Sequence, residues 1–373
     1  MHECDLKSMA TAAASDIKDK VRTDALQLVT MSAIPGAVAA LARLNIFQAL
    51  ARAGEDAELT VRELAALALP GKAINITYLA RLLRLMAAKK ILREVVAVGD
   101  DGDVTERRYA LEPIGRFLVD EAFLQLLLTF QSSRFLQTWE HIHESVLDDS
   151  AIAPFTRAHG VNAWEYFQQN PEVGVTFNKA MTGQSEVYMR AVLDVYRGFE
   201  HVNMLVDVGG GFGSSLRLIT AKYPHVKGIN FDLPQVIGAC PPLPGVEHVS
   251  GDMFVSVPSG DAIFMKYILH DWDDESCITI LKNCHQALPE HGKVIAVNHV
   301  LPEIIHFKGG DHMAVQVDIH MLAFNPSGAC EWTERDFRKL GLAAGFKQVQ
   351  TICTVDNLLA VTEFHKTVRF FCE

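Results

Sequence analysis

Residues suited to ligand chemistry stand near the middle of the chain. The run Leu-Val-Asp-Val-Gly-Gly-Gly-Phe-Gly at 205–213 is a short, mostly apolar segment that leads into four glycines. Glycines after a buried strand let the backbone turn sharply and approach a ligand closely. Asp232 follows roughly 20 positions later, where a carboxylate can accept hydrogen bonds from both hydroxyls of a ribose. The two features together predict a site for a ligand that carries a nucleoside.

A third segment favours S-adenosylmethionine as that ligand. The strand expected at 246–250 runs into Asp252 and Met253. Asp252 could accept a hydrogen bond from an adenine amino group, and Met253 could lie against the purine face. A nicotinamide dinucleotide is disfavoured because Ser214 stands where the G-x-G-x-x-G pattern needs its third glycine. A Walker phosphate loop is absent. In the alternative interpretation the glycines form a plain βα turn and the two aspartates cap strand ends.

His270 is the candidate catalytic residue. It lies in the loop that follows an apolar strand expected at 262–265, and in a doubly wound sheet such a loop faces the ligand of the first strand. Its unperturbed pKa of about 6.5 suits a base that removes a proton from a hydroxyl during attack on a methyl group. The alternative is an ordinary imidazole at a helix N-terminus. Lys266, in the same loop, could contact the cofactor or be a surface lysine.

An alternating series of strands and helices would bring these residues together. From Met204 onward the pattern predicts a parallel sheet with an added C-terminal hairpin. The expected strands are 226–231, 246–250, 262–265 and 293–297, the hairpin is 346–354 with 358–364, and the helices are 214–223, 275–288 and 333–344. The segment from 113 to about 195 is expected to be mostly helical.

The N-terminal third predicts a different kind of domain. An apolar segment with helical spacing, 26–53, is broken at Pro35-Gly36 and suits a dimer interface or, alternatively, an internal core. A capping box at Thr60–Glu63, a helix at 76–90 and a hairpin from 91–96 and 108–111 follow in winged-helix order. The acidic hairpin tip argues against DNA binding, because a tip that contacts phosphates would be basic.

Composition sets the remaining limits. A length of 373 residues favours two domains, and the net charge of −11 argues against a nucleic-acid partner. We find no run of 18 apolar residues and no signal pattern at the start, so we expect a cytoplasmic protein without a membrane span. The seven cysteines contain no CxxC pair and are expected to be reduced thiols. We predict no metal site, because no His pair has a known ligand spacing.

Several longer motifs, spread over nearly the whole chain, resemble those of one known family. LVDVGGGFG, GINFDLP, GVEHVSGDMF, FMKYILHDW and LKNCHQALPEHGKV, together with FNKAM and ERDFRKLGLAAGF, resemble the caffeic acid and flavonoid O-methyltransferases of the plant type. The resemblance implies an α/β fold: a Rossmann-like methyltransferase domain at 119–373 and a mainly helical, winged-helix-like dimerisation domain at 1–118. It also implies a homodimer and metal-independent methyl transfer from S-adenosylmethionine to a small phenolic substrate, with S-adenosylhomocysteine as product.

The resemblance also implies roles for individual residues. His270 matches the general base, and Glu331 matches one of two acidic residues that flank it. Asn298 stands where the second acidic residue is expected, and an amide would stabilise an imidazolium less than a carboxylate does. The matching cofactor-binding positions are Ser185, Gly209, Asp232, Leu233, Asp252, Met253 and Lys266. The positions that match residues clamping the phenolic ring are Met181, Met321 and Asn325.

Other departures from the family concern the acceptor. Tyr267 replaces a frequent Trp, Gly183-Gln184 replaces a common Asp-His, and His320 and Phe324 occupy pocket positions where an aliphatic residue and a His are usual. We expect a flavonoid or phenylpropanoid acceptor, and N-methylation of an aromatic amine is the alternative. A dehydrogenase and a catalytically silent binding protein are further alternatives that cofactor titration and activity assays would separate.

Overall fold

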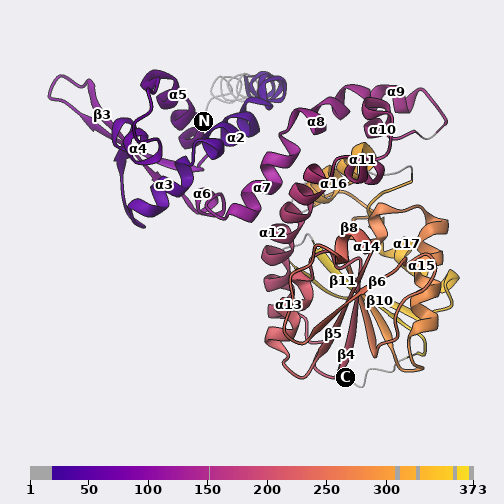
Figure 1. Ribbon diagram of the computed structural model, residues 1–373. Helices are drawn as coiled ribbons and strands as arrows, with labels where there is room; N and C mark the ends of the chain where they lie inside the picture. Colours follow the sequence, from indigo (N-terminus) through magenta and orange to yellow (C-terminus); the bar gives the residue numbers. More distant parts are fainter. Residues whose placement is uncertain (1–18, 151, 307–310, 325–327, 356–358, 369–373) are drawn as a thin grey trace, which may run out of the picture. The chain divides into compact units, whose positions relative to one another are not determined.

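The computed structural model describes residues 19–368 apart from 151, 307–310, 325–327 and 356–358 (Figure 1). It contains two compact units, Met1–Gln131 and Ser132–Glu373. Helix α7 (Glu121–Phe130), which lies beyond the boundary expected after residue 118, packs against α2 (Ala33–Arg43) and is part of the first unit.

The first unit packs helices against a small sheet. Its further helices are α3 (Ile46–Ala53), α4 (Val61–Ala68), α5 (Ile76–Ala88) and α6 (Pro113–Phe117), and its strands β1 (Leu59–Thr60), β2 (Leu92–Val98) and β3 (Val104–Leu111) have the order β1-β3-β2. The expected capping box forms at Thr60 and Glu63, with the Glu63 backbone N–H donating to Thr60 Oγ1 at 3.2 Å. Buried side chains such as Phe47 and Tyr109 join the helices to the sheet. The helix, helix and hairpin order expected from the sequence is therefore present.

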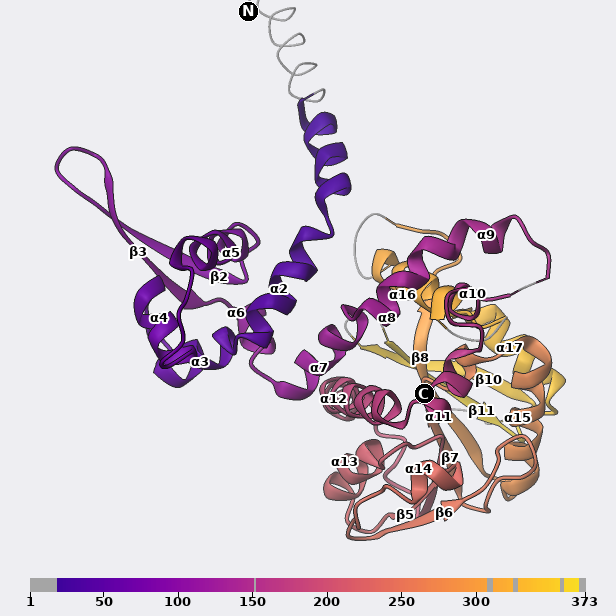
Figure 2. The same cartoon turned by 45° about the horizontal axis from the view of Figure 1, so that its top comes forward.

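The break in the N-terminal apolar segment was predicted at the wrong place. Helix Asp19–Thr30 ends at a turn at Met31 and Ser32, and α2 then begins with Pro35 in its first turn (Figure 2). Proline is tolerated there because its missing N–H has no intrahelical partner. No single helix in the described part of the chain has the length and apolar character of a membrane span, although Asp19–Thr30 and α2 together meet those criteria with a 46° bend.

The second unit is a doubly wound sheet between two layers of helices. The sheet order is β10-β11-β8-β7-β4-β5-β6, and β9 pairs with β8 outside this path. The strands are β4 (Met204–Val208), β5 (Lys227–Asp232), β6 (Val246–Ser250), β7 (Ala262–Lys266), β8 (Lys293–Leu301), β9 (Trp332–Thr333), β10 (Gln348–Val355) and β11 (Leu359–His365). Only β11 runs antiparallel between β8 and β10, so the α/β class and the terminal hairpin are confirmed.

Two buried clusters fix the helices to the two faces of this sheet. Helices α12 (Pro171–Val195) and α13 (Ser214–Lys222) cover one face, and α15 (Asp274–Ala287) and α17 (Glu334–Ala343) cover the other (Figure 1). The remaining helices are α8 (Ser133–Leu136), η1 (Gln137–His141), α9 (Ile142–Val146), α10 (Pro154–His159), α11 (Ala163–Gln169), α14 (Pro234–Ile237), η2 (Leu269–Asp271) and α16 (Asp311–Phe324).

Three local features differ from the sequence expectations. Strand β8 continues four residues beyond Val297, so Asn298 lies inside a strand. Lys266 is the last residue of β7 and does not belong to the following loop. Helix α16 and the short strand β9 were not foreseen, and both lie close in the sequence to residues that the resemblance assigns to the site.

Candidate active site

The turn after β4 is formed by glycines whose backbone lies close to neighbouring segments. Gly209 and Gly211 have φ angles of 67° and 57°, in the left-handed region that favours glycine. A Cβ atom at Gly209 would lie 2.4 Å from Cδ1 of Ile268. Glycine at this position therefore lets the turn pack against the loop that carries His270, and the backbone beyond it leads into the N-terminus of α13.

Asp232 is held by this turn at the carboxyl end of β5. Its Oδ2 accepts a hydrogen bond from the Gly211 N–H at 2.8 Å, and its Oδ1 accepts from the Leu233 N–H at 2.7 Å. Burial raises the pKa of the carboxyl above its usual value, against the lowering effect of these two bonds. Each oxygen keeps a further lone pair, so the carboxylate can also accept from two ribose hydroxyls.

The segment after β6 carries Asp252 and Met253. Asp252 Oδ1 accepts from the Phe254 N–H at 2.8 Å, and the Met253 carbonyl accepts from Asn283 Nδ2 at 2.8 Å. Phe254 packs edge to face on Trp272, with ring centroids 4.8 Å apart. The sequence analysis did not assign Phe254 or Trp272, although Trp272 stands only two positions after the candidate base.

Two ionisable side chains, the buried Asp207 and the half-buried Lys266, lie on neighbouring strands at the glycine turn. Burial raises the pKa of Asp207 on β4 to about 8, although the charge of Lys266 opposes the shift. Burial likewise lowers the pKa of Lys266 on β7 to about 8, against the charges of Asp207 and Asp271. Asp207 Oδ2 has no hydrogen-bond partner in the described part of the chain. The sequence analysis treated Asp207 only as part of the strand, and burial of a carboxylate is a property that sequence spacing does not reveal.

His270 lies in the short turn η2 beyond β7 and is only 6% exposed. Its Nδ1 is 2.7 Å from Glu331 Oε1, and its Nε2 is 3.5 Å from Asp271 Oδ1. Burial lowers the pKa of the imidazole, but the two carboxylates more than offset this effect, and the pKa lies above its usual value. Because Glu331 accepts the proton on Nδ1, the hydrogen-bond pattern assigns Nε2 as the basic nitrogen.

Backbone contacts fix the segment of Glu331 to that of His270. The Cys330 N–H donates to the His270 carbonyl at 3.0 Å, and Trp332 Nε1 donates to the Leu269 carbonyl at 2.9 Å. The Glu331 N–H donates to Asp318 Oδ1 on α16 at 2.9 Å. Residues 61 positions apart in the sequence are thus held in hydrogen-bonding register.

Asn298 is buried on β8 with its amide unpaired. It is 1% exposed, and neither its Oδ1 nor its Nδ2 has a hydrogen-bond partner among the described residues. Strand alternation puts it on the same face as Val294 and Ala296, which belong to the core that also holds Leu269 and Trp332. An unpaired buried amide is costly, and a bound ligand or water would reduce that cost.

Three of the remaining predicted residues, Ser185, Met181 and Met321, lie on α12 and α16. Ser185 Oγ donates to the Met181 carbonyl within α12 at 2.7 Å, and Ser185 is 5% exposed. Met321 is half-buried on α16, whereas Asn325 lies outside the described residues. The assignment of Ser185, Met181 and Met321 to the site therefore stays a prediction.

Aromatic residues that the sequence analysis missed surround two of the pocket positions. Trp139 packs edge-on against His320 and Phe324, with centroids 5.0 and 5.3 Å away, and Phe135 lies 5.1 Å from Phe324. Burial lowers the pKa of His320, so this ring is neutral at physiological pH. Trp139 and Phe135 lie in a helical segment with no motif of its own, and only the folded chain brings them to α16.

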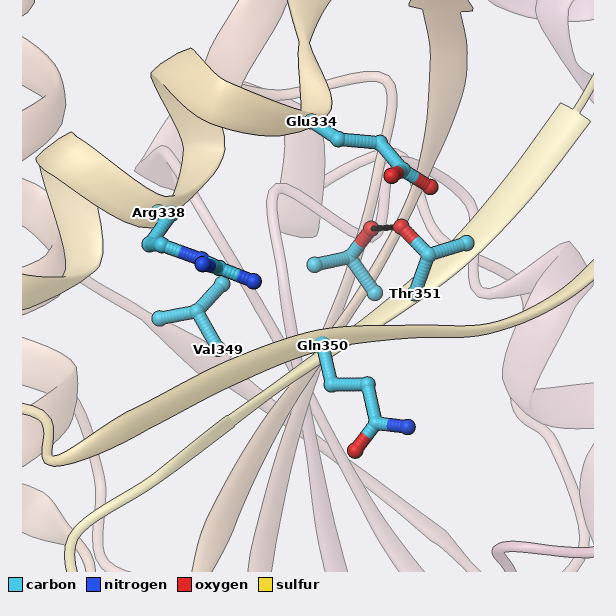
Figure 3. Close-up of a pocket in the computed structure, with 6 residues that line it drawn as sticks. Glu334, Arg338, Val349, Gln350 and Thr351 are labelled. Carbon is cyan, nitrogen blue, oxygen red and sulfur yellow. Dashed lines mark hydrogen bonds between the residues drawn. The ribbon is translucent and has the colours of Figure 1, made fainter.

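A surface pocket elsewhere in the second unit contains none of these residues. It lies between α17 and β10 and is lined by Glu334, Arg338, Val349, Gln350, Thr351 and Thr362 (Figure 3). In the described part of the chain no group of three or more His, Cys, Asp or Glu side chains is placed to hold a metal ion.

Family models match both units of the chain. An O-methyltransferase domain matches residues 139–347, and an O-methyltransferase dimerisation domain matches residues 26–121. The chain belongs to this O-methyltransferase family. An esculetin O-methyltransferase from Kitagawia praeruptora is 42% identical over 89% of this methyltransferase and 92% of its own length. A caffeic acid 3-O-methyltransferase from Capsicum annuum is 42% identical over 94% and 97% of the two chains.

Solved structures share the fold of this methyltransferase. LaPhzM has a TM-score of 0.74 and 27% identity, covering 92% of this chain and 99% of its own. Human N-acetylserotonin methyltransferase in complex with S-adenosylmethionine has a TM-score of 0.79 at 18% identity, over 93% and 98% of the two chains. The enzyme is an S-adenosylmethionine-dependent O-methyltransferase, as the resemblance to this family implied.

Proposed function

We propose that this enzyme transfers the methyl group of S-adenosylmethionine to a phenolic hydroxyl of a phenylpropanoid or flavonoid, with His270 as general base. The observation that carries the proposal is the buried contact of 2.7 Å between His270 Nδ1 and Glu331 Oε1. The names of the relatives, which act on esculetin and caffeic acid, support a phenolic acceptor.

The chemistry requires proton removal together with attack. A phenol has a pKa of about 10 and an ordinary imidazole one of about 6.5, so complete deprotonation before attack would cost several kcal/mol. The acidic neighbours of His270 narrow this gap by raising its pKa. His270 Nε2 takes the phenolic proton while the oxygen forms its bond to the methyl carbon, and the carbon–sulfur bond breaks. S-adenosylmethionine would supply the methyl group on a sulfonium, a good leaving group, so the displacement would need no Lewis acid.

We propose that the cofactor is bound mainly by the carboxyl ends of three strands. Asp232 accepts from the ribose hydroxyls, Asp252 accepts from the adenine amino group, and the Met253 side chain lies on the purine. The backbone of Gly209 approaches the ligand, and Leu233, Lys266 and Ser185 complete its surroundings. The two backbone N–H groups that hold the Asp232 carboxylate support its role, because they fix both oxygens before the ligand arrives.

We propose that the acceptor is oriented by Met181, Met321 and Asn325, with Asn298 beside the base. The unpaired amide of Asn298 supports a polar contact there, since either atom can hydrogen-bond the acceptor or the imidazole. A homodimer formed through the N-terminal unit is part of the same proposal and is supported by the match to a dimerisation domain.

The test is an acceptor panel with an isotopically labelled methyl donor. Catechols, hydroxycinnamates, flavonoids and aromatic amines are incubated with enzyme, and products are identified by mass. Methylated phenols with unmethylated amines are the expected result, and the reverse would establish N-methylation. His270→Gln, measured beside the native enzyme, should abolish turnover without weakening cofactor binding in calorimetry.

A further inference from the structure

The residue after β7 has a backbone conformation that needs an explanation. Tyr267 has a φ angle of 57°, a left-handed conformation that is uncommon and unfavourable for a bulky residue. Its N–H donates to the Val297 carbonyl on β8 at 3.0 Å, which continues the pairing of β7 with β8. The conformation is therefore held by the sheet, and it determines where the phenol ring of Tyr267 lies.

That ring stacks against two imidazoles. The His270 ring stacks on it with a centroid distance of 5.2 Å and an interplanar angle of 12°, and the His299 ring stacks on it at 5.1 Å and 28°. The Lys266 ammonium is 4.1 Å from the ring centroid, and Tyr188 packs edge-on at 6.3 Å. Tyr267 thus contacts the candidate base through its π face.

A buried hydrogen bond fixes the far edge of the ring. Tyr267 Oη and His299 Nε2 are 3.1 Å apart, and both residues are buried, at 9% and 2% exposure. His299 and Asn298 are neighbours on β8, so alternation sends their side chains to opposite faces of the strand. One residue of this pair is linked to the base through Tyr267, and the other carries the unpaired amide.

We propose that Tyr267, held by His299, is a positioning residue that orients His270 and stabilises its protonated form. The inference rests on the proposed function of His270 as general base. Glu331 fixes the Nδ1 edge of the imidazole, and a nearly parallel ring fixes its plane, so together they determine the direction of Nε2. An aromatic face within about 6 Å also attracts a cation, so it favours the imidazolium that forms when the phenolic proton arrives.

Two substitutions at Tyr267 distinguish the contribution of the ring to catalysis from that of the hydroxyl group. Tyr267→Leu removes the π face, and we expect kcat to fall by about 10-fold while the Kd of S-adenosylmethionine and the acceptor KM change by less than about 2-fold. The acidic limb of kcat/KM against pH should move to lower pH, because the imidazolium loses a stabilising contact and the pKa of His270 falls. Tyr267→Phe keeps the ring, so its acidic limb should stay in place and kcat should fall only about 2- to 3-fold.

A double-mutant cycle tests the role of His299. Tyr267→Phe, His299→Leu and the double variant are compared in kcat, with thermal unfolding as a check of folding. If the hydrogen bond between Tyr267 and His299 acts through the Tyr267 ring, kcat of the double variant should be no lower than kcat of the worse single variant. Additive losses would overturn the coupling, and this arm decides the question even if Tyr267→Leu does not fold.

Failure of this inference is distinguishable from failure of the proposed function. Tyr267→Leu with native kcat and an unmoved acidic limb would overturn the positioning role, provided that His270→Gln is inactive. Activity in the His270→Gln variant would instead show that His270 is not the general base. In that case neither Tyr267 variant could change the pH profile through it.

Discussion

The cofactor half and the acceptor half of the second unit are built in different ways. On the side where we propose that the cofactor binds, the backbone N–H groups of Gly211 and Leu233, just after β4 and β5, hold the Asp232 carboxylate, and these three residues lie within roughly 20 positions of one another. On the acceptor side, side chains from distant segments hold each other, as in the contact between His270 and Glu331. Asp232, which is held by backbone groups, should keep its place when neighbouring side chains are changed. Each substitution around His270 and Glu331 should instead change the pH profile of the activity.

The largest expected effect is the loss of the base. His270→Gln should lower kcat by at least about 100-fold, because an amide cannot take the phenolic proton. The Kd of S-adenosylmethionine should stay within about 2-fold, since Asp232 is held independently by backbone N–H groups. Steady-state kinetics and calorimetry measure the two quantities. A parallel loss of cofactor affinity would show that the two halves are not separable.

Glu331→Gln isolates the charge that acts on the base. The amide oxygen can still accept from His270 Nδ1, so the ring should keep its orientation while the negative charge is lost. We expect kcat to fall about 10-fold or more. The raised pKa of His270 should drop, so the acidic limb of kcat/KM should shift to lower pH. A large loss of activity with an unmoved acidic limb would show that Glu331 acts by geometry alone.

Asp232→Asn gives the complementary result on the cofactor side. The amide can accept from ribose hydroxyls at only one atom, and its NH₂ group would face the Gly211 or Leu233 N–H. We expect the Kd of S-adenosylmethionine to rise about 10-fold, the effect of one lost hydrogen bond to a charged group. kcat at saturating cofactor should stay near the native value, and a pH profile identical to the native one is the control. A shifted acidic limb would contradict the separation of the two halves.

The same contrast explains how far the sequence analysis reached. The glycine turn, Asp232 and the order of strands were predictable because β-strand and turn signals are local and their spacing follows from the βαβ unit. The position of His270 after β7 followed from the same rule. Glu331 was named only through the family resemblance, because no spacing rule connects the turn η2 after β7 with the residue that precedes β9.

Other parts of the acceptor side were not foreseen for the same physical reason. Helix α16 places His320 and Phe324 beside Trp139, a contact between segments about 180 positions apart that no local pattern encodes. The extension of β8 through Leu301 depends on its pairing with β11 and β9, so Asn298 was expected beyond the strand end. The stacking of Tyr267 with His270 and His299 depends on a left-handed backbone conformation, which a tyrosine in the sequence does not predict.

The smallest expected effect concerns the buried amide of Asn298. Asn298→Glu adds a carboxylate where Glu331→Gln removes one, so the two variants should move the acidic limb of kcat/KM in opposite directions. If Asn298 lies beside His270, the added charge stabilises the imidazolium, raises the pKa of His270 and shifts the limb to higher pH. Activity across a phenol panel should change by no more than about 3-fold, with gains on some acceptors, because the buried amide has no hydrogen-bond partner to lose among the residues that the structure describes. Asn298→Leu is the matched control, since it removes the polar group without adding charge and should leave the limb in place.

A large loss of activity across the whole panel in Asn298→Glu, together with an unmoved acidic limb, would contradict this expectation. It would mean that the amide of Asn298 binds the acceptor directly and does not act through the electrostatics of the base.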